Sequence, residues 1–527
     1  MQRLRTILVV ILLAGLMSGS VPTAAGTPFD AGPILFDGEE AFRGPVGRAL
    51  GVTGSGTASD PFVISGLSIP VPVAPSWVPN LGSAGVITIR HSAAHVRIVD
   101  NEFYGVSIEP GTPMKMSPPA VLLVASSHVV VENNTFRGIG GTYGAVAVLN
   151  SEDIQVLRNT FEDAFRLSVA LDSSSATVED NAFRMIPMGS GTGIMFHKPL
   201  PGSRIAGNRM TSAGAFENVG IVVFDASDAI VIRDNLLGNI FLGLRVVGSD
   251  SRPPALIRNN TVEASHCAMI DGRARLEANA FVGCSYGLEA NVADIAANNT
   301  VNGFRMLSVR DAPTALIENE GIGWLRIINV RHVTLRNIHN EVKIAEATIE
   351  GADQVLVDNV TMRIVKGLNI KADTVRISNA VLRGEHSMGF GGLRIVSRIL
   401  EVEDVAAYGT PTALSWASRS GGTATVTGST FTGGISGLIL GGDGCSQVTV
   451  TNSSSTAGAS ALLECSNTVV RNTSILGFLL AIDETVVDAR YNWWGHASGP
   501  YHDNNPGGQG SRAIGNVLFK PWRISPP

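Results

Sequence analysis

Residues 129–138 read VVVENNTFRG, an alternating apolar run that leads into Asn134 and then, two residues later, into a phenylalanine. The same signature returns as VLRNTF at 156–161, VEDNAF at 178–183 and IRNNTV at 257–262. Copies of one short unit decide the architecture of a chain, because each copy forms one supersecondary element that packs on its neighbours. The chain is therefore predicted to be a repeat protein.

Each copy contains an anchor residue, which is Asn in most of them. The 18 anchors span 391 residues in 17 steps with a mean of 23, and apart from a first step of 33 every spacing lies between 18 and 27. A period of this length with β-branched runs and no helical periodicity indicates one solenoid coil per repeat. We expect an all-β fold, a single right-handed parallel β-helix of about 18 coils that rise ~4.8 Å each.

The anchor asparagines suit an internal ladder, because a side-chain amide can bond the equivalent amide one coil away and Asn tolerates the bend between strands. The Phe or Val two residues later is expected to point inward. The predicted structural ladder consists of Asn101, Asn134, Asn159, Asn181, Asn208, Asn235, Asn260, Asn279, Asn299, Asn359, Asn379 and Asn472.

The N-terminus has the pattern of a secretory signal. Arg3 and Arg5 precede an apolar run at 7–17, and small residues follow it. We expect residues 1–25 to be removed on export. The remaining chain then divides into an N-terminal cap with the first coils at 26–100, β-helix repeats at 101–491 and a C-terminal cap at 492–527. No second apolar run of spanning length follows, so no transmembrane domain is expected after signal removal.

Four cysteines fit an oxidising compartment. Cys445 and Cys465 lie in the same slot of consecutive repeats, so strand spacing would place them within disulfide range. Cys267 and Cys284 also fall in consecutive repeats, although not in the same slot. We predict the disulfides Cys445–Cys465 and Cys267–Cys284, with free buried thiols as the alternative.

The chain ends in NWWGHASGP at 492–500, followed by GNVLFKPW at 515–522. An open β-helix end exposes strand edges that need a cover, so these segments predict an aromatic cap. Its expected members are Asn492, Trp493, Trp494, Gly495 and Trp522. A sugar-stacking platform is the competing interpretation.

Together with GTASDPFVISG at 56–66 and the Asn-Thr-Phe coils, these ends resemble the NosD-type and carbohydrate-binding and sugar-hydrolase (CASH) β-helix family. The resemblance covers essentially the whole mature chain and implies the β-helix fold. It also implies a range of functions, since the family includes sugar-processing enzymes and a copper-enzyme maturation factor.

Motifs for sugar cleavage are weak in this sequence. Hydrolases need converging carboxylates, and the chain has no Asp-Asp pair and no Gly-His-Gly; the nearest acidic groups, Glu341/Lys343/Glu346 and Asp353/Asp358, resemble solvated strand faces. Thioethers and imidazoles are soft metal ligands, and the candidates are Met114, Met116, Met185, Met188 and His197. We expect no bound cofactor, with copper and calcium as the open alternatives.

A net charge of -6 without a basic stretch argues against a nucleic-acid partner. The leading hypothesis is an exported, non-catalytic scaffold at the cell surface, in the periplasm or outside the cell, that binds extracellular polysaccharide or a surface protein. Trp77, Trp324 and Trp416 are candidate stacking platforms for sugars. The alternatives are a polysaccharide hydrolase or lyase and a NosD-like copper-binding accessory protein.

Overall fold

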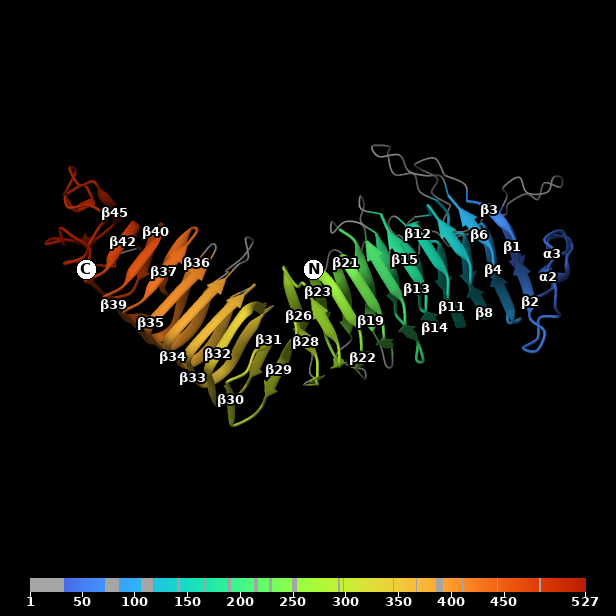
Figure 1. Ribbon diagram of the computed structural model, residues 1–527, viewed down its shortest axis with the longest axis horizontal. Coiled ribbons are helices and arrows are strands. Elements are labelled where there is room, and N and C mark those ends of the chain that lie inside the picture. Colours follow the sequence, from blue (N-terminus) through green and yellow to red (C-terminus); the bar gives the residue numbers. More distant parts are fainter. Residues whose placement is uncertain are drawn as a thin grey trace. The chain divides into compact units, whose positions relative to one another are not determined.

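The computed structural model describes residues 33–71, 85–105, 117–139, 143–164, 167–186, 191–212, 217–226, 230–248, 254–291, 294–296, 298–344, 346–365, 367–384, 392–409, 412–442, 444–482 and 485–527. The predicted signal peptide lies outside them. Parallel strands stack side by side in a β-helix (Figure 1), so the predicted fold class is confirmed. The chain forms two compact units, unit 1 from residues 1–283 with 289–296 and unit 2 from residues 284–288 with 297–527.

Most strands of unit 1 are short and are separated by the corners of each coil, although β21 and β23 near its end are longer. One face is a ten-stranded parallel sheet of β2 (Phe62–Ser65), β5 (Val96–Val99), β8 (Ser127–Glu132), β11 (Glu152–Leu157), β14 (Ala176–Glu179), β17 (Arg204–Ala206), β20 (Val231–Arg233), β22 (Ala255–Arg258), β24 (Ala274–Glu277) and β27 (Asp294–Ile295). The other faces contain β1 (Ile34–Asp37), β3 (Ser68–Pro70), β4 (Ile87–Arg90), β6 (Glu102–Tyr104), β7 (Val121–Val124), β9 (Thr135–Arg137), β10 (Val146–Leu149), β12 (Thr160–Ala164), β13 (Leu167–Asp172), β15 (Ala182–Met185), β16 (Thr192–His197), β18 (Arg209–Ser212), β19 (Val219–Ala226), β21 (Leu236–Gly248), β23 (Thr261–Asp271), β25 (Ala280–Val282) and β26 (Gly287–Asn291).

Unit 2 contains much longer strands, because hydrogen bonding between coils continues through the corners. Its elements are β28 (Thr300–Val301), β29 (Phe304–Arg310), β30 (Thr314–Glu318), β31 (Ile322–Ile328), β32 (His332–Ile344), β33 (Ala347–Ile364), β34 (Leu368–Gly384), β35 (Leu393–Gly409), β36 (Thr412–Thr427), β37 (Thr430–Gly433), β38 (Ser436–Gly441), β39 (Cys445–Thr451), β40 (Ser454–Glu464), β41 (Asn467–Arg471), β42 (Ser474–Ala481), β43 (Val487–Asp488), β44 (Pro500–Tyr501), β45 (Gly510–Ile514) and β46 (Val517–Leu518).

The number of complete turns is about 13, slightly fewer than the 18 coils expected from the anchors. Some anchor-bearing repeats contribute strands of only two residues, such as β27 and β43. Counting anchors therefore overestimates the number of complete turns.

The phenylalanine after the anchor points into the core of unit 1. Phe103, Phe136, Phe161 and Phe183 stack face to face in successive coils, with ring centroids 5.0, 4.8 and 4.7 Å apart. All four are buried, and Met210 takes the next position in register. Each buried ring removes a large apolar area from water, so this column is a major part of what holds successive coils together.

A second internal column in unit 1 consists of the anchor asparagines. Asn134 donates through Nδ2 to Asn159 Oδ1 at 3.0 Å, and Asn159 donates in the same way to Asn181 Oδ1 at 3.0 Å. Each Oδ1 also accepts the backbone N–H of the preceding anchor. Equivalent bonds run from Asn101 through Asn208, Asn235 and Asn260 to Asn279. The next predicted member, Asn299, is a buried residue of unit 2.

In unit 2 the assignment of Asn359, Asn379 and Asn472 to this column is wrong. These residues are exposed and adopt φ near 51°, so each occupies the left-handed corner position one residue before the buried slot. Unit 1 uses Asn133 and Asn259 in that corner position. Asn fits both positions, because it tolerates positive φ and can also pair its amide internally, and the spacing of the repeats does not distinguish the two.

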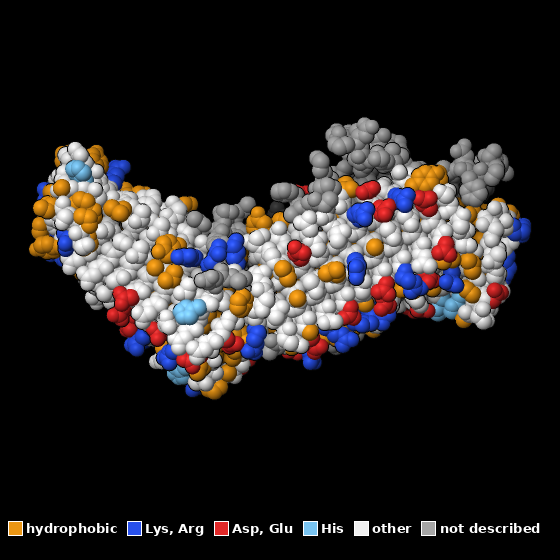
Figure 2. Space-filling view, viewed as in Figure 1, with side chains coloured by type: hydrophobic (Ala, Val, Ile, Leu, Met, Phe, Trp, Pro, Cys, Tyr) orange, Lys and Arg blue, Asp and Glu red, His pale blue; other side chains and the backbone are white. Residues whose placement is uncertain are grey.

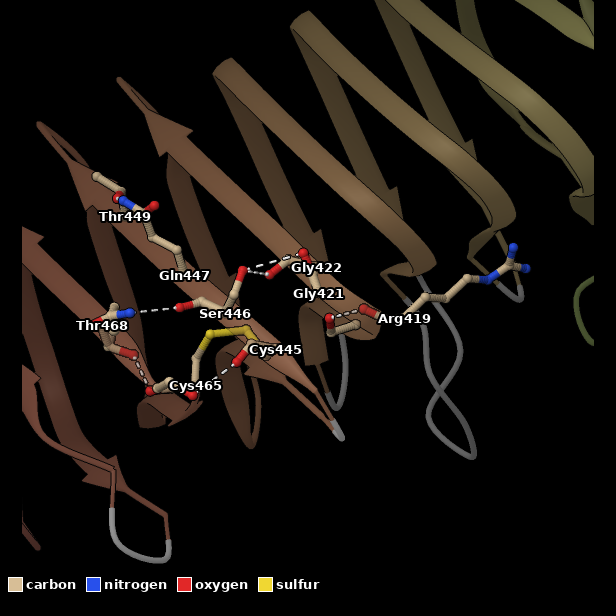
Figure 3. Close-up of a disulfide and its surroundings, with 12 residues drawn as sticks. Arg419, Gly421, Gly422, Cys445, Ser446, Gln447, Thr449, Cys465 and Thr468 are labelled. Atoms are coloured by element: carbon tan, nitrogen blue, oxygen red, sulfur yellow. Dashed lines mark hydrogen bonds between the residues drawn. A yellow bond between two sulfur atoms is a disulfide. The ribbon is translucent and has the colours of Figure 1, made fainter.

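The four cysteines of the two predicted disulfides are all oxidised. Cys445 at the start of β39 is bonded to Cys465 just after β40, with Cα atoms 5.0 Å apart (Figure 3). Ser446 Oγ donates to the carbonyl of Gly422 at 3.0 Å, which joins the same region to the previous coil. Cys267 and Cys284 are disulfide-bonded as well, and none of the four cysteines is free.

Both ends of the described chain contain aromatic packing. The short helices α2 (Glu40–Arg43) and α3 (Pro45–Ala49) place Phe42 between Phe36 and Phe62, with ring centroids 4.3 and 4.8 Å apart. At the other end the indole of Trp494 is fully buried.

The C-terminal segment is joined to the last coils of unit 2 by hydrogen bonds. Asn492 Oδ1 accepts the backbone N–H of Thr473, and Trp493 accepts from Ile475. Trp522 donates its indole N–H to the carbonyl of Ala497 at 3.0 Å. A left-handed turn at Gly495 turns the chain over this end. These aromatics are therefore placed as an end cover.

Candidate functional site

Many charged side chains of unit 1 form ion pairs between neighbouring coils. On the ten-stranded sheet, Glu132 contacts both Arg97, at 2.8 Å, and Arg158. Burial raises the pKa of Glu132, but the hydrogen bonds from the two guanidinium groups outweigh it and hold the pKa below its ordinary value of 4.5. Figure 2 shows acidic and basic side chains interspersed over this unit.

Unit 2 repeats this arrangement on two of its faces. Glu350 and Lys371 lie opposite each other on β33 and β34, with their charged atoms 2.9 Å apart. On the next pair of strands Arg376 lies opposite Glu401 at 2.7 Å. Opposite charges in register stabilise adjacent strands, so these groups are accounted for by the architecture.

One of the acidic groups that the sequence offered as remnants of a cleavage site, Asp358, is structural. Asp358 on β33 accepts hydrogen bonds from Ser378 at 2.8 Å and Asn379 at 3.1 Å, and these bonds lower its pKa. It also lies 3.8 Å from the guanidinium of Arg336. A carboxylate held ionised by one coil on each side is suited to joining coils, whereas a general acid needs a raised pKa.

One row of unit 2 departs from charge alternation. We define the outer row as six residues in register on strands that pair side by side (β32, β33, β34, β35, β37 and β40), namely Lys343, Arg363, Arg383, Tyr408, Thr432 and Thr456. Five of the six residues directly follow a buried, inward-facing residue, and Lys343 follows a β-bulge. Because side chains alternate between the two sides of a strand, the row faces outward. Arg383, Thr432 and Thr456 are exposed, and the other three are half-buried.

The first three residues of the outer row are cations on three adjacent strands. Figure 2 shows Lys and Arg side chains gathered over the face of unit 2 that is turned toward the viewer. The guanidinium of Arg383 lies over the ring of Tyr408, 5.4 Å from its centroid. This contact fixes the third cation, because a cation is attracted to the face of an aromatic ring. The row therefore changes from cations through one aromatic residue to hydroxyl groups.

The sequence prediction missed this row, although a signal for it was present. Arg363, Arg383, Tyr408 and Thr456 each lie four residues after an anchor. Lys343 lies six residues after Asn337, because the register shifts between Asn340 and Lys343. An alignment of the repeats on their anchors would have placed most of the row in one column.

Of the metal candidates, the structure describes only Met185 and His197. Met185 is only 1% exposed and belongs to the core, while Met114, Met116 and Met188 lie outside the described residues. His197 contacts Asp172 through Nδ1 at 2.9 Å and Asp225 through Nε2 at 3.4 Å, so both ring nitrogens face carboxylates of neighbouring coils.

In the part of the chain that the structure describes, no group of three or more His, Cys, Asp or Glu side chains could hold a metal ion. A copper site needs converging soft ligands. The candidates that are described, Met185 and His197, do not form one.

Two of the three tryptophans proposed as sugar platforms are buried, so that prediction is wrong for them. Trp324 and Trp416 are each 1% exposed, and Trp416 donates its indole N–H to Ser397 at 2.9 Å. Trp77 lies outside the described residues. Both buried residues occupy inward slots of the coil, where a large apolar side chain is stabilised by burial.

Among the described residues, no helix is long and apolar enough to cross a membrane. Residues 82–242, less than a third of the chain, match the family described as periplasmic copper-binding protein (NosD). No curated protein matches the chain.

Among solved structures, the chain is similar to an alginate lyase of the PL6 family, AlyGC. The identity is 11% and the TM-score 0.22, over 94% of this chain and 99% of that one. At this distance the likeness has no bearing on activity.

Proposed function

We propose that the protein is an exported β-helix scaffold that binds extracellular glycan along the outer row of unit 2 without cleaving it. The observation that supports this most directly is the row itself, with ionic and hydroxyl groups presented outward on six strands that pair side by side. The disulfides and the signal pattern at the N-terminus both suit a protein that works outside the cytoplasm.

A binding role fits the groups in the row better than catalysis does. Guanidinium and ammonium groups donate several hydrogen bonds, and threonine hydroxyls both donate and accept, which matches the hydroxyl-rich surface of a glycan. The acidic groups Asp358, Asp373 and Asp488 have lowered pKa values because hydrogen bonds from neighbouring side chains hold them ionised. A glycosidase acid needs the opposite shift.

The test is a glycan array on the purified mature protein, combined with reducing-sugar and unsaturated-product assays on each glycan that binds. We expect specific retention of at least one extracellular polysaccharide with no product formed. Robust turnover would replace the scaffold with a hydrolase or lyase, and binding of no glycan would overturn the proposal. Stoichiometric copper binding in the absence of glycan binding would favour the accessory-protein alternative.

A further inference from the structure

The sequence contains six Asn-X-Ser/Thr tripeptides, the acceptor pattern for N-linked glycans in exported proteins. The structure places five of them at the same point of the coil. Each of the five begins at the left-handed corner, with an exposed asparagine whose φ lies between 51° and 56°. These corner asparagines are Asn133 and Asn259 in unit 1 and Asn359, Asn452 and Asn472 in unit 2.

The alternation of side chains along a strand explains why the pattern begins at the corner and not at the buried ladder. Two residues after the corner the side chain points outward, and Thr135, Thr361 and Ser454 are half-buried hydroxyl residues at that position. Two residues after a ladder asparagine the side chain points into the core, as Phe136 does after Asn134. A hydroxyl at the inward position would be buried, so complete acceptor patterns are confined to the exposed asparagine of the coil.

The amide of a corner asparagine has a hydrogen atom to spare. Asn359 Nδ2 donates to Asn337 Oδ1 on the neighbouring coil at 2.8 Å. An amide nitrogen carries two hydrogens, so one can be replaced by a sugar while the other keeps this bond. The buried amide of Asn134 instead donates to two backbone carbonyls and to Asn159 Oδ1. Attachment of a sugar is therefore compatible with the folded coil at the corner and incompatible with it at the ladder.

From these observations we infer that the left-handed corner of the coil is an N-glycosylation site. In the transfer, Nδ2 of the asparagine forms a bond to the anomeric carbon of an oligosaccharide carried on a polyprenyl phosphate. The bond between that carbon and the phosphate oxygen breaks, the lipid phosphate leaves with the electron pair, and the amide proton passes to a base of the transferase. The lipid-linked donor and the transferase are supplied by the producing cell. The attached glycans are distinct from the glycan proposed to bind the outer row, and the two proposals are independent.

The experiment is peptide mapping by mass spectrometry of the mature protein, purified from the organism that produces it. We expect peptides with the corner asparagines to gain the mass of an oligosaccharide. Asn379 is a control within the same chain, because it is exposed at the same corner with φ 51° but is followed two residues later by Val381. The peptide with Asn379 should have its unmodified mass.

Two substitutions made in that organism separate the acceptor pattern from the corner itself. Thr361→Ala removes the hydroxyl of the pattern and should abolish the glycan on Asn359. Val381→Thr completes the pattern at Asn379 and should add a glycan there. Threonine fits this position, because Thr361 lies opposite Val381 one coil earlier. Circular dichroism should show an unchanged fold in both variants, since both side chains lie on the outward side of their strands.

Three results would overturn the inference. The first is an exported protein with no glycan on any of the corner asparagines, including one modified only at Asn298, where the sixth pattern begins. The second is a glycan on Asn359 that survives Thr361→Ala, because the acceptor pattern would then not be what is recognised. The third is Val381→Thr with Asn379 unmodified while Asn359 is modified, because the corner would then not determine acceptance. None of these results bears on glycan binding by the outer row.

Discussion

Units 1 and 2 have the same repeat but use different internal ladders beside the corner. In unit 1 the buried slot contains Asn, and each amide bonds the next. On β33 and β34 of unit 2 the slot is apolar, with Val360 and Ala380. From Ser429 onward hydroxyls take over, with Ser453 Oγ accepting the N–H of Ser429 at 3.2 Å and Thr473 Oγ1 accepting the N–H of Ser453.

The comparison shows which part of the repeat the fold requires. Both units keep a residue with positive φ at this corner, for example Asn133 in unit 1 and Asn359 in unit 2. Only unit 1 follows it with a continuous amide ladder. The left-handed corner is thus the general requirement, and the buried Asn is one of several solutions for the slot that follows it.

The largest effect should come from breaking the amide ladder. In Asn159→Ala the backbone N–H of Asn134 loses its acceptor, and the carbonyl of Val131 loses a donor at 2.8 Å. Buried groups left without partners cost about 1–3 kcal/mol each, so we expect a loss of roughly 3–4 kcal/mol in the free energy of unfolding. Urea denaturation monitored by circular dichroism measures it.

Asn359→Gly is the matched control in unit 2, because that Asn is exposed and Gly adopts positive φ without strain. A change of about 0.5 kcal/mol or less is expected. If both substitutions cost the same, the distinction between the two slots is wrong.

The next effect concerns the covalent link in unit 2, where the ladder has only one hydroxyl per coil. Replacing both Cys445 and Cys465 by Ser opens a loop whose ends are 20 residues apart in sequence. A loop of that length is worth about 3 kcal/mol through the entropy of the unfolded chain. Reduction of the wild type should reproduce the shift in the urea midpoint, and a double variant with an unchanged midpoint would show that the bond adds nothing to the ladder.

A smaller loss is expected when the hydroxyl ladder is interrupted. Ser453→Ala removes the acceptor for the N–H of Ser429 and the donor to the carbonyl of Thr451 at 2.7 Å. A single neutral hydrogen bond contributes about 1 kcal/mol net, with a further cost for a buried donor left unpaired. We expect about 1–2 kcal/mol, clearly below the value for Asn159→Ala.

Ser453→Thr is the conservative test of the same position, because Thr473 occupies the equivalent slot one coil later. It should restore the stability. A loss as large in the Thr variant as in the Ala variant would mean that packing, and not the hydroxyl, decides this slot.

The repeat was enough to predict the class of fold and the Cys445–Cys465 pair, because both follow from spacing along the chain. It was not enough to place Asn359, Asn379 and Asn472, since one residue of offset separates a buried slot from an exposed corner and Asn is suited to both.

The outer row was missed for a related reason. Its chemistry appears only when Arg363 and Arg383 are read across coils, and the shift of register before Lys343 hides the first member. The tryptophans were misplaced for a different reason. Composition cannot tell an inward Trp324 from an exposed one, because the direction of a strand residue depends on its register.

The smallest effect concerns the ion pairs that alternate across coils. Glu132 has a pKa below 4.5 in the folded protein because Arg97 and Arg158 donate to its ionised form, despite the opposing effect of burial. A carboxyl group of this kind stabilises the fold above its unfolded pKa, and that contribution disappears as the pH falls through its folded pKa. Melting temperatures of the wild type and Glu132→Gln should therefore differ at neutral pH and converge below about pH 4, the range in which a glutamate protonates. A difference that persists undiminished into acid would assign the loss to packing around Glu132 and remove the ion pairs from the account of unit 1.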